Sequence, residues 1–246
     1  MKTIIDGDIV TFRAAFTAEP HDLLSLLKTG MPEQDALEQV KYEEENGEWI
    51  ACARADDMLE QMLHEVEATS YEVWLSGEQN FRYRVYPEYK ANRLAAKRPK
   101  WEHQVKAHLV DKWNANWAHG CEADDMMGVR CTELGDNSII ATIDKDLDMI
   151  PGWHYNFVKK VKYYVDPDQA FRFFCYQLMV GDTADGIKGV PGIGPKKAEK
   201  FLSSTLPAEW IPGIKDMYSC DEEFEMNAAC LYIWRKENDT WKSLML

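Results

Sequence analysis

The sequence lacks any long apolar run, and no stretch approaches the roughly 18 consecutive apolar residues of a membrane-spanning helix. The N-terminal residues MKTIIDGDIV also lack the successive basic, apolar and small-residue regions of a secretory signal. The six cysteines form no C-x-x-C pair, and a chain of 246 residues does not need disulfides, so we expect them to be reduced. These absences predict a cytoplasmic globular protein with no membrane partner.

Basic charge is scarce overall, but it is unevenly distributed. The formal net charge of −14 argues against a nucleic-acid partner, because a phosphate backbone usually needs a basic face. Residues 1–80 carry 18 acids and 5 bases, whereas residues 81–120 carry 9 bases and 3 acids. Residues 186–200 form a second basic island with 4 bases and 1 acid. The two basic islands therefore flank an acidic segment, residues 121–185, whose carboxylates need an explanation.

Strand and helix patterns alternate along most of the chain. We expect strands at 2–5 continued by 9–10, 49–53, 71–75, 81–85, 138–143, 153–157 and 161–165. We expect helices at 23–28, 33–45, 56–67, 101–117, 122–134 and 167–180. This alternation predicts an α/β fold with a mostly parallel central sheet flanked by helices. The pattern changes after Gly181, which predicts a core domain over 1–180 and a separate C-terminal region over 181–246.

Acidic residues gather at the ends of several predicted elements. Because ligands of parallel sheets bind beyond the carboxyl ends of the strands, these acids are candidates for one shared site. Converging carboxylates repel one another, and oxygen ligands suit Mg²⁺ or Mn²⁺, while the absence of His/Cys ligand spacing argues against zinc. The clusters are Asp6 with Asp8; Glu122, Asp124 and Asp125; Asp144 with Asp146; and Asp182 with Asp185.

Each acid also has a simpler explanation. Glu122 or Asp124 could favour a helix N-terminus through the helix dipole, and Asp6-Gly7 or Asp182 could belong to turns. These explanations suit single residues better than four clusters at the ends of successive elements. For the whole set we therefore favour a pair of divalent ions that activate water and stabilise the leaving oxygen in phosphodiester cleavage.

The first basic island interleaves an aromatic residue with cations. Tyr89 next to Lys90, with Arg93 three residues further on, could stack a base or ribose while the cations hold phosphates. A solvated basic helix is the alternative. Further cations for nucleic-acid binding follow at Lys97, Arg98 and Lys100.

The second basic island contains the sequence GVPGIGPKKA at residues 189–198. Its glycines, Gly189, Gly192 and Gly194, permit a tight turn with exposed N–H groups, and Pro195 suits a helix start. With Lys196 and Lys197 following, the segment predicts a cradle that binds phosphates without reading bases. It is not a P-loop, because the Gly-Lys-Ser/Thr ending is missing. The alternative is an ordinary glycine-rich loop.

Five motifs in order make the chain resemble the 5′ nucleases, a family that includes flap endonucleases, the 5′-nuclease domain of bacterial DNA polymerase I and phage 5′→3′ exonucleases. The resemblance covers nearly the whole chain and is strongest to the exonucleases of short-tailed lytic phages. It implies a PIN-like nuclease core, a helical arch at about 86–118 and a C-terminal helix–three-turn–helix module. The motifs are IIDGD at the start, YKANR at 89–93, EADD at 122–125, TIDKD at 142–146, and GDTADGIKGVPGIGPKKA at 181–198.

The resemblance also implies roles for single residues. Lys90 and Arg93 would engage the scissile phosphate with Tyr89 beside them, and residues 189–198 would grip duplex DNA and hold a K⁺ ion. The ligands of two Mg²⁺ ions would be Asp6, Glu122, Asp124, Asp125, Asp144, Asp146, Asp182 and Asp185.

Two features depart from the family pattern. Many members carry an Asp after the second core strand, where this chain has Ser76, so one metal site loses a ligand. Asp8 or Glu78 could compensate, and we count Asp8 among the candidate ligands. The segment from Leu94 to Trp113 matches no motif, which leaves open whether the arch is closed or an open clamp.

The sequence as a whole predicts a monomeric Mg²⁺-dependent 5′→3′ exodeoxyribonuclease with flap endonuclease activity, in which Mn²⁺ can replace Mg²⁺. Its substrates would be double-stranded, nicked or flapped DNA and the RNA strand of RNA–DNA hybrids, in replication, recombination or primer removal. One alternative is a PIN-type ribonuclease, against which the 189–198 segment argues. The other is a non-catalytic DNA-binding module whose acids are structural.

Overall fold

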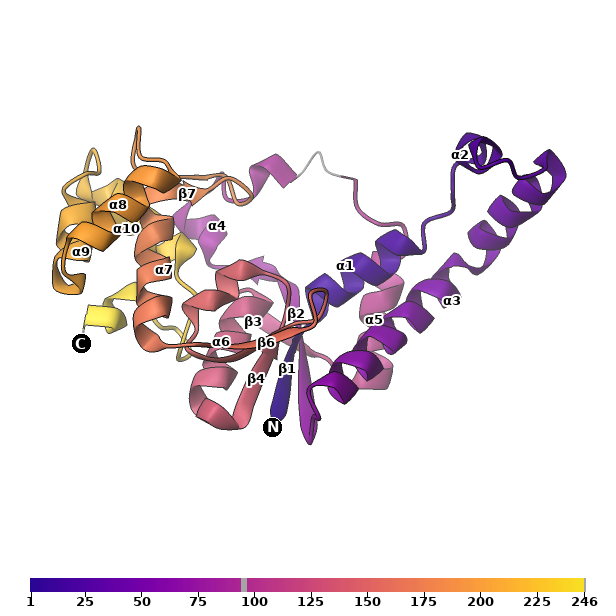
Figure 1. Ribbon diagram of the computed structural model, residues 1–246, viewed down its shortest axis with the longest axis horizontal. Coiled ribbons are helices and arrows are strands. Elements are labelled where there is room, and N and C mark those ends of the chain that lie inside the picture. The colour runs from indigo at the N-terminus through magenta and orange to yellow at the C-terminus, as the bar shows by residue number, and fades with distance from the viewer. Residues whose placement is uncertain (94–96, 246) are drawn as a thin grey trace.

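A six-stranded sheet forms the centre of the computed structural model, which describes residues 1–93 and 97–245 (Figure 1). The strand order is β3-β2-β1-β4-β5-β6, and all neighbours are parallel except the antiparallel pair β5 and β6. The predicted mostly parallel sheet is therefore confirmed. The strands are β1 (Lys2–Asp6), β2 (Ser70–Asn80), β3 (Asn116–Gly120), β4 (Ser138–Ala141), β5 (Gly152–Asn156) and β6 (Val161–Val165).

Helices cover both faces of this sheet, as the alternating pattern predicts. Ile4 and Ile5 are both fully buried and point to opposite faces, because successive side chains of a strand alternate. Ile5 packs with α1, α3 and α5, whereas Ile4 packs with α6, α7 and the C-terminal helices. The α-helices that precede residue 181 are α1 (Gly7–Thr17), α2 (Leu23–Lys28), α3 (Glu33–Glu65), α4 (Arg82–Val85), α5 (Glu102–Trp113), α6 (Ala123–Leu134) and α7 (Pro167–Val180).

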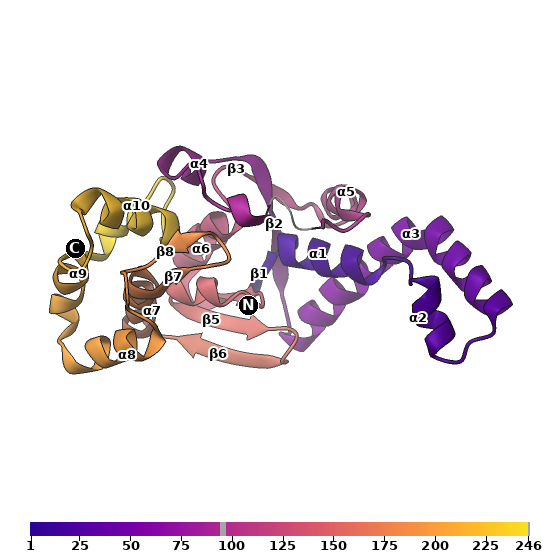
Figure 2. The same ribbon diagram turned by 90° about the horizontal axis from the view of Figure 1, so that it is seen from above.

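The strand predicted at 49–53 is wrong, because this segment lies inside α3. Ala51, Ala55 and Leu59 are fully buried at a spacing of four residues, which is a helical period. Close packing against Trp101 explains the glycine inside this helix, since a Cβ on Gly47 would lie 2.4 Å from the Trp101 indole nitrogen. Figures 1 and 2 show α2 and the far end of α3 extending away from the sheet.

Three other boundaries also differ from the predictions. Residues 9–10 belong to α1, because Asp6 ends β1 and its carboxylate caps the helix by accepting from the Ile9 N–H. Residues 82–85 form α4 instead of a strand, after Asn80 accepts a hydrogen bond from the Arg82 N–H. The helix predicted over 101–117 ends at Trp113, since Asn114 adopts a left-handed φ of 51°, and the missed strand β3 follows.

The C-terminal region begins with a two-stranded ribbon, β7 (Gly181–Asp182) and β8 (Ile187–Lys188). It continues with α8 (Pro195–Ser204), α9 (Pro207–Lys215) and α10 (Asp221–Leu231), which lie at the end of the molecule opposite α2 (Figures 1 and 2). Phe174 of α7, Ile214 of α9 and Phe224 of α10 share one hydrophobic cluster. Residues on both sides of the predicted domain boundary near 180 therefore contribute to one core.

Part of the predicted arch, residues 94–96, lies outside the described residues. On either side of it the structure shows a 3₁₀ turn at Ala91–Arg93 and the helix α5. No helix among residues 1–93 and 97–245 is long and apolar enough to cross a membrane.

Candidate active site

The carboxyl edge of the sheet holds the first acids. Asp6 ends β1 and is 2% exposed, and its carboxylate accepts hydrogen bonds from the Ile9 N–H at 3.0 Å and the Thr142 hydroxyl at 2.8 Å. The Thr142 hydroxyl in turn accepts from the Asp144 N–H at 3.0 Å, and Asp144 accepts from the Asp146 N–H at 2.9 Å. A chain of local hydrogen bonds thus connects the ends of β1 and β4 and brings Asp6, Asp144 and Asp146 to one edge.

The buried acids at this edge destabilise one another's charged forms. Burial, and then the neighbouring carboxylates Asp8 and Asp144, raise the pKa of Asp6 to about 7. Burial, Asp144 and Asp182 raise the pKa of Asp146 to about 7 in the same way. Asp124, in the first turn of α6, has a pKa well above its usual value because of burial and the charges of Asp6 and Asp144. Five acids, Asp6, Asp124, Asp144, Asp146 and Asp182, therefore share one electrostatic environment, and we call them the central acids.

Two further contacts arrange the central acids. Gln177 of α7, 1% exposed, donates its side-chain N–H to Asp146 at 2.6 Å. Asp182 lies in the β7–β8 ribbon and accepts from the Ala184 N–H at 2.8 Å. The sequence gives no signal for Gln177, because a single glutamine inside an apolar helix belongs to no motif. Thr142 is also unanticipated, although it belongs to the TIDKD motif.

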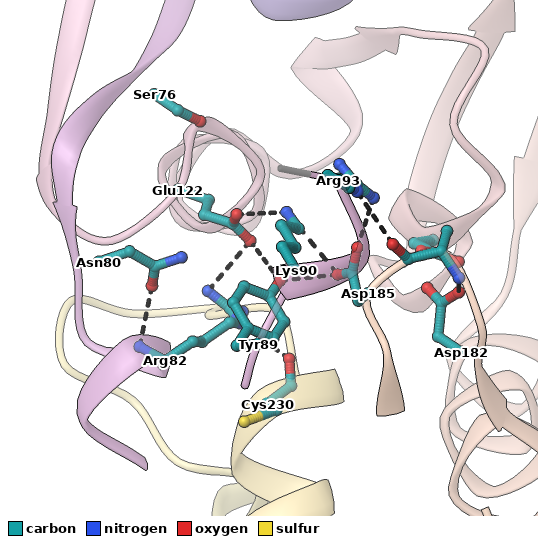
Figure 3. Close-up of polar contacts among 12 residues, drawn as sticks. Ser76, Asn80, Arg82, Tyr89, Lys90, Arg93, Glu122, Asp182, Asp185 and Cys230 are labelled. Carbon is teal, nitrogen blue, oxygen red and sulfur yellow. Dashed lines mark hydrogen bonds and ion pairs between the residues drawn. The ribbon is translucent and has the colours of Figure 1, made fainter. Parts of the chain in front are cut away.

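A second group of acids is already neutralised by cations (Figure 3). Lys90 forms ion pairs with Glu122 and, at 3.7 Å, with Asp185, and Arg93 forms an ion pair with Asp185. The Tyr89 hydroxyl lies 2.9 Å from Glu122 and 2.7 Å from Asp185. The structure therefore brings together the predicted residues Tyr89, Lys90, Arg93, Glu122 and Asp185, and Figure 3 shows their side chains converging.

The electrostatics of this second group differ from those of the central acids. Burial alone would raise the pKa of Glu122, but the charges of Arg82 and Lys90 lower it below its usual value. Burial still raises the pKa of Asp185, against the opposing charge of Lys90. Burial raises the pKa of the Tyr89 phenol, and the Glu122 charge adds to this effect, so Tyr89 stays a neutral donor.

Arg82 binds the remaining predicted ligand, Asp125. The guanidinium of Arg82, 2% exposed, binds both carboxylate oxygens of Asp125 at 2.5 and 2.9 Å. Asp125 also accepts from the backbone N–H groups of Glu122 at 3.0 Å and Trp234 at 3.2 Å. Its four contacts use the lone pairs that an ion would need, so its position favours a structural role over direct ligation.

Arg82 also connects this site to the C-terminal region. Its side chain donates to the backbone carbonyls of Cys230 at 2.8 Å and Tyr232 at 2.7 Å. It lies 3.6 Å from Glu122 as well. One buried cation thus joins α4, the start of α6 and the C-terminal end of α10. The FRYR sequence around Arg82 gives no signal from which this role could be foreseen.

Asp8, in the first turn of α1, lies beside Ser76 of β2. Asp8 accepts from the Ser76 N–H at 2.9 Å and forms an ion pair with Lys106 of α5 at 2.9 Å. The Ser76 hydroxyl accepts from the Ala123 N–H at 2.9 Å, at the start of α6. Asp8 is therefore close to the central acids, but it is paired with a lysine, Lys106.

The predicted cations of the arch lie on the surface. Lys97 pairs with Glu19, and the Lys100 backbone N–H donates to the same carboxylate at 2.7 Å. Arg98 lies 3.3 Å from Glu102 within the same segment. These contacts attach one end of the arch to the end of α1, and the side chains of Lys97 and Arg98 remain more than three-quarters exposed.

The glycine-rich segment lies directly beside the β7–β8 ribbon. A Cβ on Gly189 would lie 2.4 Å from the Gly181 nitrogen, so only glycine permits this close approach to the strand that carries Asp182. Gly192 has a φ of 75°, and Gly194 is the N-cap of α8, in front of Pro195. Gly192, Gly194, Lys196 and Lys197 are all exposed. The second basic island therefore presents a helix start and two lysines to solvent, next to the acids.

The central acids fit a divalent cation. Within residues 1–93 and 97–245, no three acid, histidine or cysteine side chains are close enough together to enclose an ion as they stand. Their oxygen donors nevertheless suit a hard cation, which would remove the repulsion that raises the pKa values of Asp6 and Asp146. The Gln177 side-chain oxygen is also buried without a hydrogen-bond partner among the described residues, and water carried by an ion could supply one.

Comparison with known proteins agrees with this geometry. Residues 1–171 match the family model described as the 5′-3′ exonuclease, N-terminal resolvase-like domain. The chain belongs to this family. It is 27% identical to the exodeoxyribonuclease of Enterobacteria phage T3 over 235 residues, which cover 86% of this chain and 69% of that protein. It is 32% identical to the flap endonuclease Xni of Shewanella woodyi over 152 residues, which cover 53% of this chain and 57% of that protein.

A solved structure shows the same fold. The T5 D15 protein co-crystallised with metal ions superposes with a TM-score of 0.63 at 19% identity, and the alignment covers 92% of this chain and 86% of that one. The family predicted from the five motifs is therefore confirmed, and so is the fold class.

Proposed function

We propose that the chain is a Mg²⁺-dependent 5′→3′ exodeoxyribonuclease that also cleaves flap structures. One observation carries the proposal: Asp6, Asp144 and Asp146 lie at the carboxyl edge of a parallel sheet, and Asp124 and Asp182 are close enough to interact with them through their charges. Burial and neighbouring carboxylates raise the pKa values of Asp6 and Asp146 to about 7. The names of the relatives, a phage exodeoxyribonuclease and a flap endonuclease, support this reaction for a member of the same family.

The central acids would hold the metal ions, with Glu122 and Asp185 at the side nearest Lys90. All of these groups offer oxygen ligands, which favour Mg²⁺, with Mn²⁺ as a substitute. Bound ions would supply an activated water molecule and stabilise the leaving oxygen. Asp125 is left out of this ligand set because Arg82 binds both of its oxygens.

Lys90 and Arg93 would hold the scissile phosphate. Both cations border the acids, where they offset the charge of Glu122 and Asp185 in the absence of DNA. A phosphate arriving with its own negative charge can exchange for these carboxylates, which are then free to bind metal. Tyr89, buried beside them, would keep the Lys90 side chain oriented through their common partners Glu122 and Asp185.

The two basic islands would bind the rest of the DNA. Gly189, Gly192 and Gly194 shape the turn, and Lys196 and Lys197 give it positive charge, which suits the phosphates of a duplex downstream of the cut. On the other side of the acids, the arch would hold the strand being cut through the exposed cations Lys97, Arg98 and Lys100. The acidic remainder of the chain would repel DNA and confine it to this track.

Several finer features belong to the same proposal. We propose that the hairpin at 189–198 binds a K⁺ ion through backbone carbonyls, that residues 181–246 act as a helix–three-turn–helix module, and that the enzyme acts as a monomer in the cytoplasm. Nicked and flapped duplexes are the expected substrates, and the RNA strand of RNA–DNA hybrids is a further one.

Digestion of a duplex labelled separately at its 5′ and 3′ ends tests this function. With Mg²⁺ we expect wild-type protein to release the 5′ label first, and we expect EDTA or Asp182→Ala to stop release. DNA that stays intact but bound by both proteins would instead show a non-catalytic binding module. Faster cleavage of single-stranded RNA than of DNA would show a PIN-type ribonuclease.

A further inference from the structure

A groove of about 440 Å³ lies where β2 and β3 end. Ser76 pairs with Ala118 and Asn80 pairs with Gly120, so three residues of β2, 77–79, bulge out opposite a single residue of β3. A Cβ on Gly77 would lie 2.6 Å from the Ala118 carbonyl oxygen, so the bulge needs glycine there. The groove is lined by Gly77, Glu78, Gln79, Trp117, Ala118, His119 and Gly120.

This groove adjoins the candidate active site. It lies at the carboxyl ends of two parallel strands, which is the edge that carries the acids. The Lys106 ammonium lies 5.9 Å from the centroid of the Trp117 ring and 2.9 Å from Asp8, which in turn binds the Ser76 N–H. Figure 3 shows Ser76 and Asn80, the residues on either side of the bulge, on the strand beside Glu122.

The chemistry of the groove suits an unpaired nucleobase. Trp117 is 38% exposed, so a face or edge of its indole remains open for stacking. Glu78, Gln79 and His119 are exposed polar side chains around it, which can hydrogen-bond to the edge of a base. A base inside a duplex has both faces covered by its neighbours, and the last pair of a duplex end has one face open but its hydrogen-bonding edges paired. Only an unpaired base offers both a face to Trp117 and a free edge to the polar side chains around it.

We propose that Trp117 stacks on an unpaired base of the substrate strand close to the bond that is cut. This inference rests on the proposed function, and it adds a binding site for single-stranded nucleotides at the β2–β3 edge. The site would favour ends that carry or readily expose unpaired bases. It is separate from Tyr89, which is buried among Glu122, Asp185 and Lys90.

Binding of two DNA duplexes tests the proposal. Both carry a short 5′ overhang, which is unmodified in one and abasic in the other, and Ca²⁺ replaces Mg²⁺ while fluorescence anisotropy measures affinity. Trp117→Ala should weaken binding of the unmodified DNA about 5- to 100-fold, because one stacked base contributes that much. The same variant should leave the affinity for the abasic DNA unchanged, and Trp117→Phe should retain most of the affinity for the unmodified DNA.

Trp49→Ala provides the matched control, because Trp49 is a 68% exposed tryptophan on α3 and should affect neither duplex. Equal weakening of both duplexes by Trp117→Ala, or no weakening of either, would overturn the inference. Cleavage by the wild type with Mg²⁺ is measured separately. If the wild type cleaves DNA but Trp117→Ala does not weaken binding of the unmodified DNA selectively, the stacking site is wrong and the proposed reaction stands. If Trp117→Ala weakens that binding selectively but the wild type does not cleave DNA, the proposed reaction is wrong and the stacking site stands.

Discussion

The central acids and the acids around Lys90 carry the same charged group in two different environments. Among the described residues, the only cation within ion-pair distance of the central acids is the exposed Lys145, 4.0 Å from Asp146. Glu122, Asp125 and Asp185, the paired acids, are bound instead by Arg82, Lys90 and Arg93. Burial therefore raises the pKa values of Asp6, Asp124 and Asp146, while its cations lower that of Glu122.

This difference separates two tasks within one site. The paired acids have their counterions built into the chain, so they are stable in the absence of a ligand. The central acids lack such counterions, so their mutual repulsion destabilises the folded state. A bound cation therefore stabilises the folded protein most at these acids. The comparison predicts that substitutions in the two groups change stability in opposite directions.

We expect the largest effect from Asp124→Asn, which should lower the rate of DNA cleavage. The amide keeps the shape but removes a charge that the neighbouring acids repel, so cleavage should fall on the order of 10³-fold. The Tm in EDTA should rise at the same time, because the repulsion is relieved. Cleavage assays and thermal melts of the same preparation check both parts. A lower Tm in EDTA would break the comparison between the two groups.

Arg82→Met should have the largest effect on stability. It leaves Asp125 buried without its cation, which costs about 3–5 kcal/mol. Urea unfolding in EDTA measures the loss. The double variant Arg82→Met/Asp125→Leu is the control, since it removes both charges. It should recover part of the stability, because the backbone groups that Arg82 and Asp125 bind stay unpaired. If the single and double variants were equally unstable, the ion pair would not explain the effect.

Lys90→Ala should lower cleavage about 100-fold, because a cation beside the scissile phosphate is lost. Glu122 and Asp185 also lose a counterion, so the Tm in EDTA should fall, which is the opposite of Asp124→Asn. Single-turnover cleavage and thermal melts measure the two effects. An unchanged cleavage rate would exclude Lys90 from the phosphate site.

The pH dependence of stability should distinguish the metal-free and metal-bound protein. In EDTA the pKa values of Asp6 and Asp146 are about 7 when folded, above the usual value of 3.8. The folded state thus keeps these two protons at pH values where the unfolded chain has lost them, so both groups contribute stability at low pH that is lost, on the order of several kcal/mol, as the pH rises to 7. Glu65 and Glu72, whose pKa values are lowered to about 2, contribute in the opposite direction at low pH. Urea unfolding at several pH values measures this, and saturating Mg²⁺ should abolish the decrease. The same pH dependence of stability with and without Mg²⁺ would contradict the account.

Asp8→Asn should have the smallest effect. Asp8 already has Lys106 as a partner, so we expect less than about a tenfold loss of cleavage. Ser76→Asp tests the departure from the family pattern at the same place, because it adds an acid where many members have one. If Asp8→Asn were as damaging as Asp124→Asn, and Ser76→Asp rescued it, Asp8 would be the compensating ligand.

Much of the fold and of the site could be predicted from the sequence. The position of Asp6 and Asp144 at one edge of the sheet could be predicted, because a parallel sheet brings the ends of its strands together and because the acids stand directly after apolar strand segments. The residues that position these acids were not found. Arg82 and Gln177 act through contacts with distant segments, and no local pattern reports such contacts.

The errors in secondary structure have the same cause. The apolar residues at 49–53 fit a strand when taken alone, and only packing of Gly47 against Trp101 and burial of Ala51 and Ala55 show one continuous helix. The strand β3 could not be predicted, because the spacing of Trp113 and Trp117 fits a single continuous helix. In the structure Asn114 ends that helix with a left-handed conformation, and β3 follows.

Thermal stability with and without Mg²⁺, in wild type and in Asp124→Asn, tests the central claim most directly. We expect Mg²⁺ to raise the Tm of the wild type clearly, because the ion removes the repulsion among the central acids. In Asp124→Asn the metal-free Tm should start higher and respond much less to Mg²⁺. An equal response of the two proteins to Mg²⁺ would show that the central acids are not the metal site.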